Sequence, residues 1–142
     1  MNIKLYNYLV DQLIRHEGVK LKPYFDTENI LTIGIGRNLE GKGLSMDEAM
    51  LLLKNDINET IDSLENMGFY QKCNDARKIV LINMAFNLGI NGLLRFKKMI
   101  EAINADNYEL AYHEMLDSKW SNQVKGRAHE LAKIMQKGDI DD

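Results

Sequence analysis

The sequence predicts a mainly helical α+β protein, in which a small hairpin lobe accompanies a larger helical lobe. Two observations predict this class. Apolar residues recur at helical spacing through most of the 142 residues, and one short stretch changes to the alternation of a strand. A chain of this length can bury one core, so we expect a single domain over residues 1–142. Its hairpin lobe should cover about residues 17–45, and its helical lobe residues 1–16 and 46–142.

The first helix is predicted to end at Glu17. Apolar side chains at positions 3, 6, 9, 10, 13 and 14 form one stripe, Asn2 can cap the start, and Gly18 can stop the helix. Residues 20–25 and 30–35 should then pair as an antiparallel hairpin around the turn sequence FDTEN. Along residues 31–36, a threonine and two glycines alternate with apolar residues, and such a bare face allows close neighbours.

The remainder of the chain predicts a helical lobe. Ser45 and Glu48 have the spacing of a capping box for a long helix, which should end near Gly68. Residues 75–88 are apolar nearly all round, which is typical of a buried central helix. Shorter helices are predicted near residues 93–104, 107–117 and 125–136, and the tail GDIDD should fray.

Charge and composition argue against several classes of protein. The chain contains 18 Lys and Arg and 21 Asp and Glu. Its net charge of -3 does not favour nucleic acid as a partner. Cys73 is the only cysteine, so no internal disulfide can form. Charged residues interrupt the first 17 positions, so we expect neither a signal peptide nor stable membrane association, and synthesis in the cytoplasm.

No cofactor or metal is expected. The loop GRNLEGKG is one residue short of a phosphate-binding loop, because Gly43 stands where a metal-binding hydroxyl is required. The three histidines share no metal-ligand spacing with each other or with Cys73.

Glu17 stands out because it lies in the last turn of a predicted helix. The negative end of the helix dipole is there, and it disfavours ionisation of a carboxyl group. If the chain turns at Gly18, the hairpin carries Asp26 back towards the helix end, and Thr32 projects towards the same cleft. Two acids beside a groove can hydrolyse a glycoside, because one protonates the leaving oxygen while the other directs water or shields the cationic sugar. Thr32 is placed to hold that water.

These residues carry a resemblance to a known family. The segment HEGVKLKPYFDTENILTIGIG resembles the active-site segment of the T-even phage lysozymes, the glycoside hydrolase family 24 endolysins. Eight residues separate Glu17 from Asp26, and five separate Asp26 from Thr32, as in that family. The likeness continues through LSMDEAMLLLKNDI, NMAFNLG and the WSNQVKGRA segment, and so covers most of the chain. It implies a lysozyme-like fold.

The resemblance also implies roles for individual residues. Glu17 would be the general acid, Asp26 would assist or direct the water, and Thr32 would help to position it, with inversion at the sugar carbon. Arg127 would approach Glu17 as a structural partner, and Phe86 would belong to the groove that holds the glycan. The implied substrate is bacterial peptidoglycan, cut at the β-1,4 bond between N-acetylmuramic acid and N-acetylglucosamine.

Position 37 departs from the family pattern. Arg37 follows TIGIG where a histidine engaged in a salt bridge is known in the family, so that ion pair should be either absent or remade. The region from Asn38 to Leu44 is also short for the family.

The resulting expectation is a monomeric endolysin that depends on a separate protein for access to the wall. A lytic transglycosylase on a related fold and a glycan-binding module without turnover stay open as alternatives.

Overall fold

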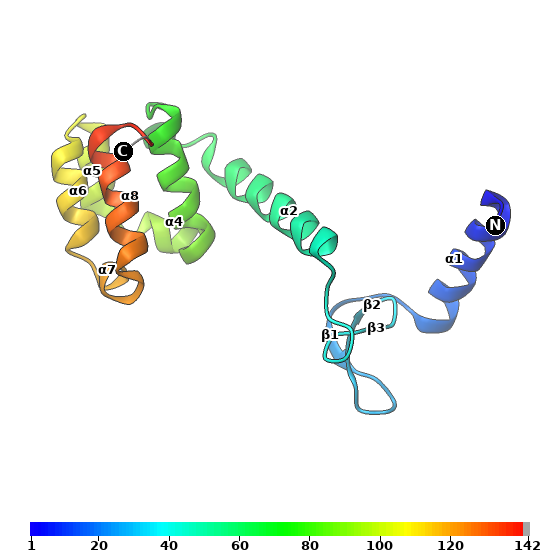
Figure 1. Cartoon of the computed structure of the whole chain (residues 1–142). Coiled ribbons are helices and arrows are strands. Elements are labelled where there is room, and N and C mark those ends of the chain that lie inside the picture. Colours follow the sequence, from blue (N-terminus) through cyan, green and yellow to red (C-terminus); the bar gives the residue numbers. More distant parts are fainter. Residues whose placement is uncertain (141–142) are drawn as a thin grey trace. The chain divides into compact units, whose positions relative to one another are not determined.

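A computed structural model describes residues 1–140, and within them it contains eight helices and one three-stranded antiparallel sheet (Figure 1). The predicted α+β class, mainly helical with a short antiparallel hairpin, is therefore confirmed. Contacts group the chain into two units, Met1–Leu51 and Leu52–Asp142, and each is described by itself. The assignment of the first helix to the helical lobe of a single domain stays a prediction.

The first unit begins with α1, Ile3–Glu17, whose bounds match the prediction. Its start is capped as expected, because the Leu5 backbone N–H donates to the Asn2 side-chain oxygen at 2.9 Å. Its end is set by Gly18, which has a φ of +75° and donates its backbone N–H to the Ile14 carbonyl at 2.9 Å. Glu17 is thus fixed as the last helical residue.

The sheet contains β1 (Lys20–Phe25), β2 (Leu31–Gly34) and β3 (Arg37–Asn38) in that order. The hairpin of β1 and β2 was predicted, and its register places Tyr24 opposite Thr32. The third strand was not predicted. It has only two residues, too few for any alternation to be recognised, and it is defined by pairing with β2.

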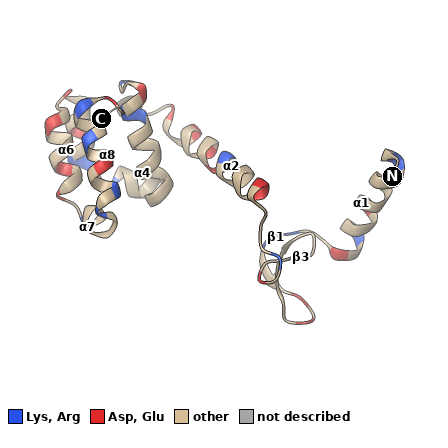
Figure 2. Cartoon of the chain, in the orientation of Figure 1, with Lys and Arg blue, Asp and Glu red and all other residues tan. Residues whose placement is uncertain are grey.

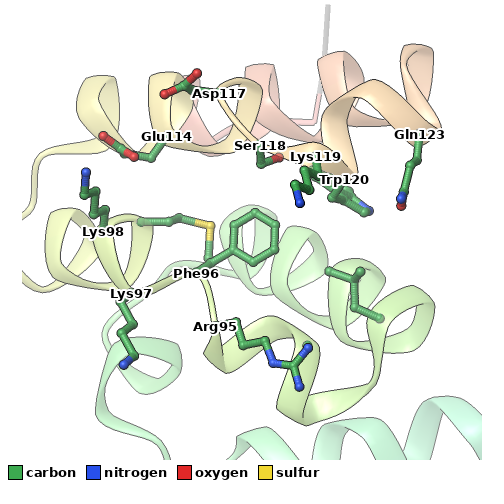
Figure 3. A pocket seen from close by; sticks show the side chains of 13 residues that line it. Arg95, Phe96, Lys97, Lys98, Glu114, Asp117, Ser118, Lys119, Trp120 and Gln123 are labelled. Carbon is green, nitrogen blue, oxygen red and sulfur yellow. The ribbon is translucent and has the colours of Figure 1, made fainter.

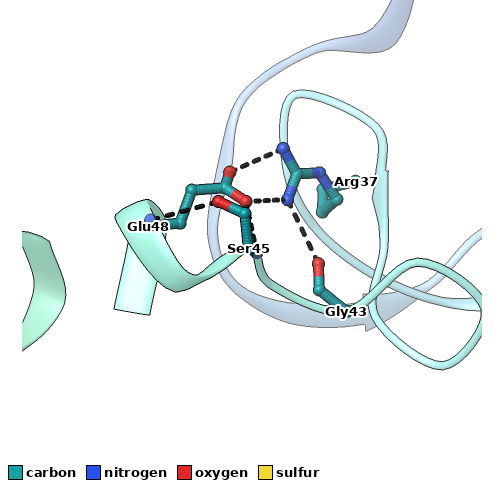
Figure 4. Close-up of polar contacts among 4 residues, drawn as sticks. All are labelled: Arg37, Gly43, Ser45 and Glu48. Atoms are coloured by element: carbon teal, nitrogen blue, oxygen red, sulfur yellow. Dashed lines mark hydrogen bonds and ion pairs between the residues drawn. The ribbon is translucent and has the colours of Figure 1, made fainter. Parts of the chain in front are cut away.

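Arg37 has a new ionic partner at the start of α2, Met46–Leu64 (Figure 4). Its guanidinium lies 2.6 and 2.7 Å from the two carboxylate oxygens of Glu48, and it also donates to the Gly43 carbonyl at 3.1 Å. Glu48 accepts the Ser45 backbone N–H at 2.8 Å, while the Ser45 hydroxyl accepts the Glu48 backbone N–H at 3.2 Å. The predicted capping box therefore forms, and Arg37 ties it to β3.

This ion pair predicts an acid-sensitive contribution to stability. Hydrogen bonds from Arg37, followed by those from Ser45, lower the pKa of the Glu48 carboxyl from 4.5 to about 2. A carboxyl whose pKa is lower in the folded state stabilises fully above its unfolded pKa, and that contribution is lost as pH falls towards the folded pKa. We therefore expect Glu48→Gln to lower the melting temperature at pH 7 and to have a smaller effect near pH 2 to 3.

Thermal unfolding of both proteins over that pH range measures the difference. Glu40→Gln is the matched control, because Glu40 is an exposed acid in the neighbouring turn. An effect of Glu48→Gln that is independent of pH would contradict this account of the pair.

The second unit contains the end of α2 and six further helices in the described residues: α3 (Gly68–Gln71), α4 (Asp75–Leu94), α5 (Lys97–Asn104), α6 (Tyr108–Leu116), α7 (Lys119–Val124) and α8 (Gly126–Lys137). Four of the predicted helices are thus found with small changes of boundary. The predicted end of the central helix at residue 88 coincides with a kink in α4, where Gly89 has a φ of +76°. The short helices α3 and α7 were not predicted.

The core of this unit is built round α4, as its apolar sequence predicts. Val80, Leu81 and Met84 are fully buried there. Arg77 joins α4 to its neighbours, since its Nε donates to the Met135 carbonyl of α8 at 2.8 Å and its guanidinium lies 3.5 Å from the ring centre of Tyr108 in α6. These contacts hold α4, α6 and α8 as one helical body.

No single helix within residues 1–140 is long and apolar enough to cross a membrane. The pair of α4 and α5 passes that test by length and composition, but it is bent by 95°, and the apolar residues of α4 supply much of the core. The tail GDIDD was predicted to fray, and its last two residues, 141–142, lie outside the described residues.

Candidate functional site

Glu17 is positioned by the end of α1. It is exposed, and its carboxylate lies against Gly36, in the turn between β2 and β3. The helix therefore delivers this acid to the end of the hairpin where Lys20 pairs with Gly34, whereas Asp26 follows the other end of β1. No side-chain hydrogen bond or ion pair holds Glu17 within residues 1–140.

Asp26 is positioned by the turn that joins β1 to β2. One of its carboxylate oxygens accepts the backbone N–H groups of Glu28 and Ile30, each at 2.9 Å. Asn29 adopts a φ of +63°, and its backbone N–H donates to the Asp26 carbonyl at 2.9 Å. The second carboxylate oxygen accepts no hydrogen bond from any described residue, so it is available to water or a sugar hydroxyl.

Thr32 lies in β2 and is only 3% exposed. Its hydroxyl donates to the Ile30 carbonyl at 2.8 Å. This bond uses the single proton of the hydroxyl and leaves lone pairs that can accept a hydrogen bond from a water molecule. Thr32 is thus oriented by the strand itself.

Asp26 and Thr32 are connected through one residue. The Ile30 backbone N–H donates to Asp26, and the Ile30 carbonyl accepts from Thr32. Glu17, at the end of α1, contacts the turn that follows the strand bearing Thr32. All three predicted residues therefore belong to one compact unit, and two of them share a backbone anchor. Their catalytic roles stay predictions.

Arg127, at the start of α8, is held by Asn83 of α4. Its Nε lies 2.9 Å and its terminal nitrogen 2.6 Å from the Asn83 side-chain oxygen, and the terminal nitrogen also reaches the Asn83 carbonyl at 3.3 Å. Sequence reasoning did not identify Asn83. The available signal was an asparagine inside the apolar sequence of α4, because a polar side chain within a core helix needs a partner.

Phe86 separates two hollows of the helical unit and is 44% exposed. One hollow, of about 410 Å³, is mainly aliphatic and includes Ile79, Ile82 and Arg127 in its lining. The other, of about 370 Å³, has the carboxylates of Asp56 and Glu59 on α2, whose acidic residues are red in Figure 2. Phe86 therefore presents an exposed aromatic ring between an apolar and an acidic surface.

A third hollow, of about 630 Å³, is lined by four cations and by two acids, Glu114 and Asp117 (Figure 3). Its cations are Arg95, Lys97, Lys98 and Lys119, and its apolar lining includes Trp120. The lining thus has an excess of two positive charges, four cations against two acids, in a chain whose net charge is -3. Composition alone could not reveal it, since the four residues come from two separate segments.

Residues 1–140 contain no group of three or more His, Cys, Asp or Glu side chains that could hold a metal ion. Of the three histidines, His113 pairs with Glu109 at 3.2 Å on the surface of α6.

Comparison with known proteins decides the family. A profile of the phage lysozyme family matches residues 14–137, which include all five predicted site residues. The chain belongs to the phage lysozyme family. Membership confirms the resemblance and the lysozyme-like fold, and it makes the chain an enzyme of the glycosidase class. For phage lysozymes the implied substrate class is the peptidoglycan of the bacterial cell wall.

Individual relatives agree with this assignment. Two probable T4-type lysozymes of Dictyostelium discoideum are 29% and 28% identical to this phage lysozyme family member. These matches cover 92% and 93% of the chain, and 94% and 95% of the two lysozymes. The pre-baseplate central spike protein Gp5 of Enterobacteria phage T4 is 32% identical over 94% of the chain, which spans only 28% of that protein.

Proposed function

We propose that this phage lysozyme family member hydrolyses the β-1,4 bond between N-acetylmuramic acid and N-acetylglucosamine in peptidoglycan, with inversion at the sugar carbon. Glu17 acts as the general acid and Asp26 directs the attacking water, with Thr32 as a further acceptor for it. The observation that carries the proposal is that Glu17, at the end of α1, lies against Gly36 after β2, while Asp26 and Thr32 are both anchored by Ile30 before that strand.

The chemistry assigns different tasks to the two acids. Glu17 must hold a proton when the glycan binds, and it donates this proton to the leaving oxygen. Asp26 must be ionised, and the carboxylate oxygen that is not occupied by the turn accepts a proton from water as it attacks the opposite face of the sugar. The Thr32 oxygen, with its own proton committed to Ile30, accepts a hydrogen bond from that water.

Two residues of the helical unit complete the proposal. Phe86 offers an exposed ring against which a sugar face can pack. Arg127 is proposed as the structural partner of Glu17, although no described residue bonds to Glu17, and Asn83 fixes the direction of the Arg127 guanidinium. An arginine near Glu17 would favour the charged form of the acid, so its task is to orient the carboxylate rather than to keep it protonated.

Asp26→Asn separates the charge of Asp26 from its role in the turn. The amide oxygen of asparagine can still accept the Glu28 and Ile30 backbone N–H groups, so the turn and the melting temperature should be preserved. Loss of the carboxylate should lower the rate of wall hydrolysis by about 10²-fold or more. Rates and melting curves of wild type and variant test this, with Glu28→Gln as a control acid in the same turn. Undiminished activity of Asp26→Asn would exclude the proposed role.

Analysis of the released sugars distinguishes hydrolysis from its nearest rival. A hydrolase leaves reducing muramic acid ends, and an inverting one forms a single anomer that proton NMR can assign at early times. A lytic transglycosylase would leave anhydro ends, because the sugar's own hydroxyl closes the ring. A glycan-binding module would bind walls and release no fragment.

The biological setting is part of the proposal. We infer a monomeric endolysin that is made in the cytoplasm of an infected bacterium, reaches the wall with the help of a separate protein, and lyses the cell. Size-exclusion chromatography tests the monomer. A larger assembly would favour a baseplate setting of the kind named for the spike relative.

A further inference from the structure

Gly36 has no room for a side chain, because the carboxylate of Glu17 occupies that space. A Cβ atom built on Gly36 would lie 2.7 Å from Oε2, 2.9 Å from Cδ and 3.2 Å from Cγ of Glu17. Non-bonded carbon and oxygen atoms pack at about 3.5 Å, so a Cβ at this position would overlap the acid. The bare Cα of Gly36 and the side chain of Glu17 are therefore in direct contact.

This contact is the restraint that the structure provides for Glu17. The acid is exposed, and no described residue donates a hydrogen bond to it or forms an ion pair with it. A glutamate side chain that is free in solvent samples many rotamers. Contact with a fixed backbone atom removes the rotamers that would carry the carboxylate into that atom, and it excludes water from one side of the group.

Gly34 provides a comparison, because it shares the backbone conformation of Gly36 but lacks this contact. The two glycines have φ values of +70° and +68°, so both lie in the left-handed region that other residues rarely adopt. A Cβ on Gly34 would meet no atom within 4 Å. Backbone conformation explains a glycine at either position, but of the two only Gly36 contacts Glu17.

We propose that Gly36 is a positioning residue of the active site, whose bare Cα seats the carboxylate of Glu17 in the orientation for proton donation to the glycan. The inference rests on the proposed function, in which Glu17 is the general acid. Proton transfer requires hydrogen-bond distance between the acid and the leaving oxygen. A methyl group at position 36 would push the carboxylate away by roughly 1 Å, a displacement that can cost on the order of 10²-fold in rate.

The test compares Gly36→Ala with Gly34→Ala. Both substitutions place an alanine at a φ near +70°, so both should lower the melting temperature to a similar extent. Gly36→Ala should lower kcat by roughly 10²-fold with little change in KM, whereas Gly34→Ala should stay within about 3-fold of wild type. Equal kcat values for the two variants would overturn the proposal.

A second measurement does not depend on activity. With carbon-13-labelled glutamate, the carboxyl resonance of Glu17 should move in Gly36→Ala and stay in place in Gly34→Ala. In the wild type, a nuclear Overhauser effect should connect the Glu17 γ protons with the Gly36 α protons. This measurement uses only the wild-type protein, so it does not depend on whether a variant folds. Absence of that effect in the folded wild type would rule out the contact between Gly36 and the side chain of Glu17.

The two proposals fail separately. If Glu17→Gln retains full activity, the assignment of the acid is wrong, although the resonance and Overhauser measurements still decide whether Gly36 seats the side chain. If Glu17→Gln is inactive but the two alanine variants have equal kcat, Glu17 remains the general acid and the positioning role of Gly36 is rejected.

Discussion

Glu17→Gln is expected to lower the rate of peptidoglycan hydrolysis by about 10²–10⁴-fold, which is the usual contribution of a general acid. Glutamine has nearly the same shape as glutamate, but it has no proton of suitable acidity for the leaving oxygen. The melting temperature should not fall, since Glu17 is exposed and no described residue pairs with it. Removing a carboxylate from the negative end of the α1 dipole should, if anything, stabilise the helix.

Clearing of purified bacterial walls and thermal unfolding should be measured on the same preparations. Glu40→Gln is the matched control, because it removes one exposed acid from the same unit and should leave both quantities unchanged. A clear fall in melting temperature for Glu17→Gln would make Glu17 mainly a structural partner of Arg127. Equal and negligible clearing by wild type and variant would favour the glycan-binding module.

Local chemistry explains why much of the fold could be predicted from the sequence. The bounds of α1 follow from Asn2 and Gly18, and the start of α2 follows from the capping box of Ser45 and Glu48. In each case the deciding partners lie within four residues, so the pattern of residue types is sufficient.

The missed elements depend on contacts that residue patterns do not reveal. Helix α7 is six residues long, and its sequence has no helical periodicity to recognise. It forms where the Ser118 side chain caps Ser121 and where Trp120 is buried against Phe96. Strand β3 likewise exists because β2 offers it a partner. Burial and long-range pairing override weak local preference in both cases.

The candidate site divides in the same way. The elements that carry Glu17, Asp26 and Thr32 could be predicted, namely the end of a helix, the turn of a short hairpin and its second strand. The contact of Glu17 with Gly36 could not be predicted, because it requires the conformation of the turn after β2. Arg37 could be flagged as a departure from the family, but its partner Glu48 is separated from it by a loop of irregular structure.

The helical unit should depend strongly on its single tryptophan, and Trp120→Ala is expected to destabilise the protein by roughly 3–5 kcal/mol. Trp120 is 4% exposed, and its ring packs edge to face against Phe96 with the two ring centres 5.9 Å apart. Its Nε1 donates to the Asn87 side-chain oxygen at 2.8 Å. Truncation removes all three contributions and leaves a cavity beside Phe96. For a protein of this size, the melting temperature should fall by on the order of 10 °C.

Trp120→Phe assigns the effect of Trp120 to the ring or to the hydrogen bond, and Phe86→Ala shows the effect of removing an exposed ring. Trp120→Phe keeps most of the buried aromatic surface and loses the donor to Asn87, so it should cost about 1 kcal/mol. Phe86→Ala removes an aromatic ring that is 44% exposed, and it should cost about 1 kcal/mol or less while weakening glycan binding. Circular dichroism melts measure all three, since the variants at position 120 lack tryptophan fluorescence. Equal losses for Trp120→Phe and Trp120→Ala would mean that the bond to Asn87, rather than ring burial, fixes α7 on the core.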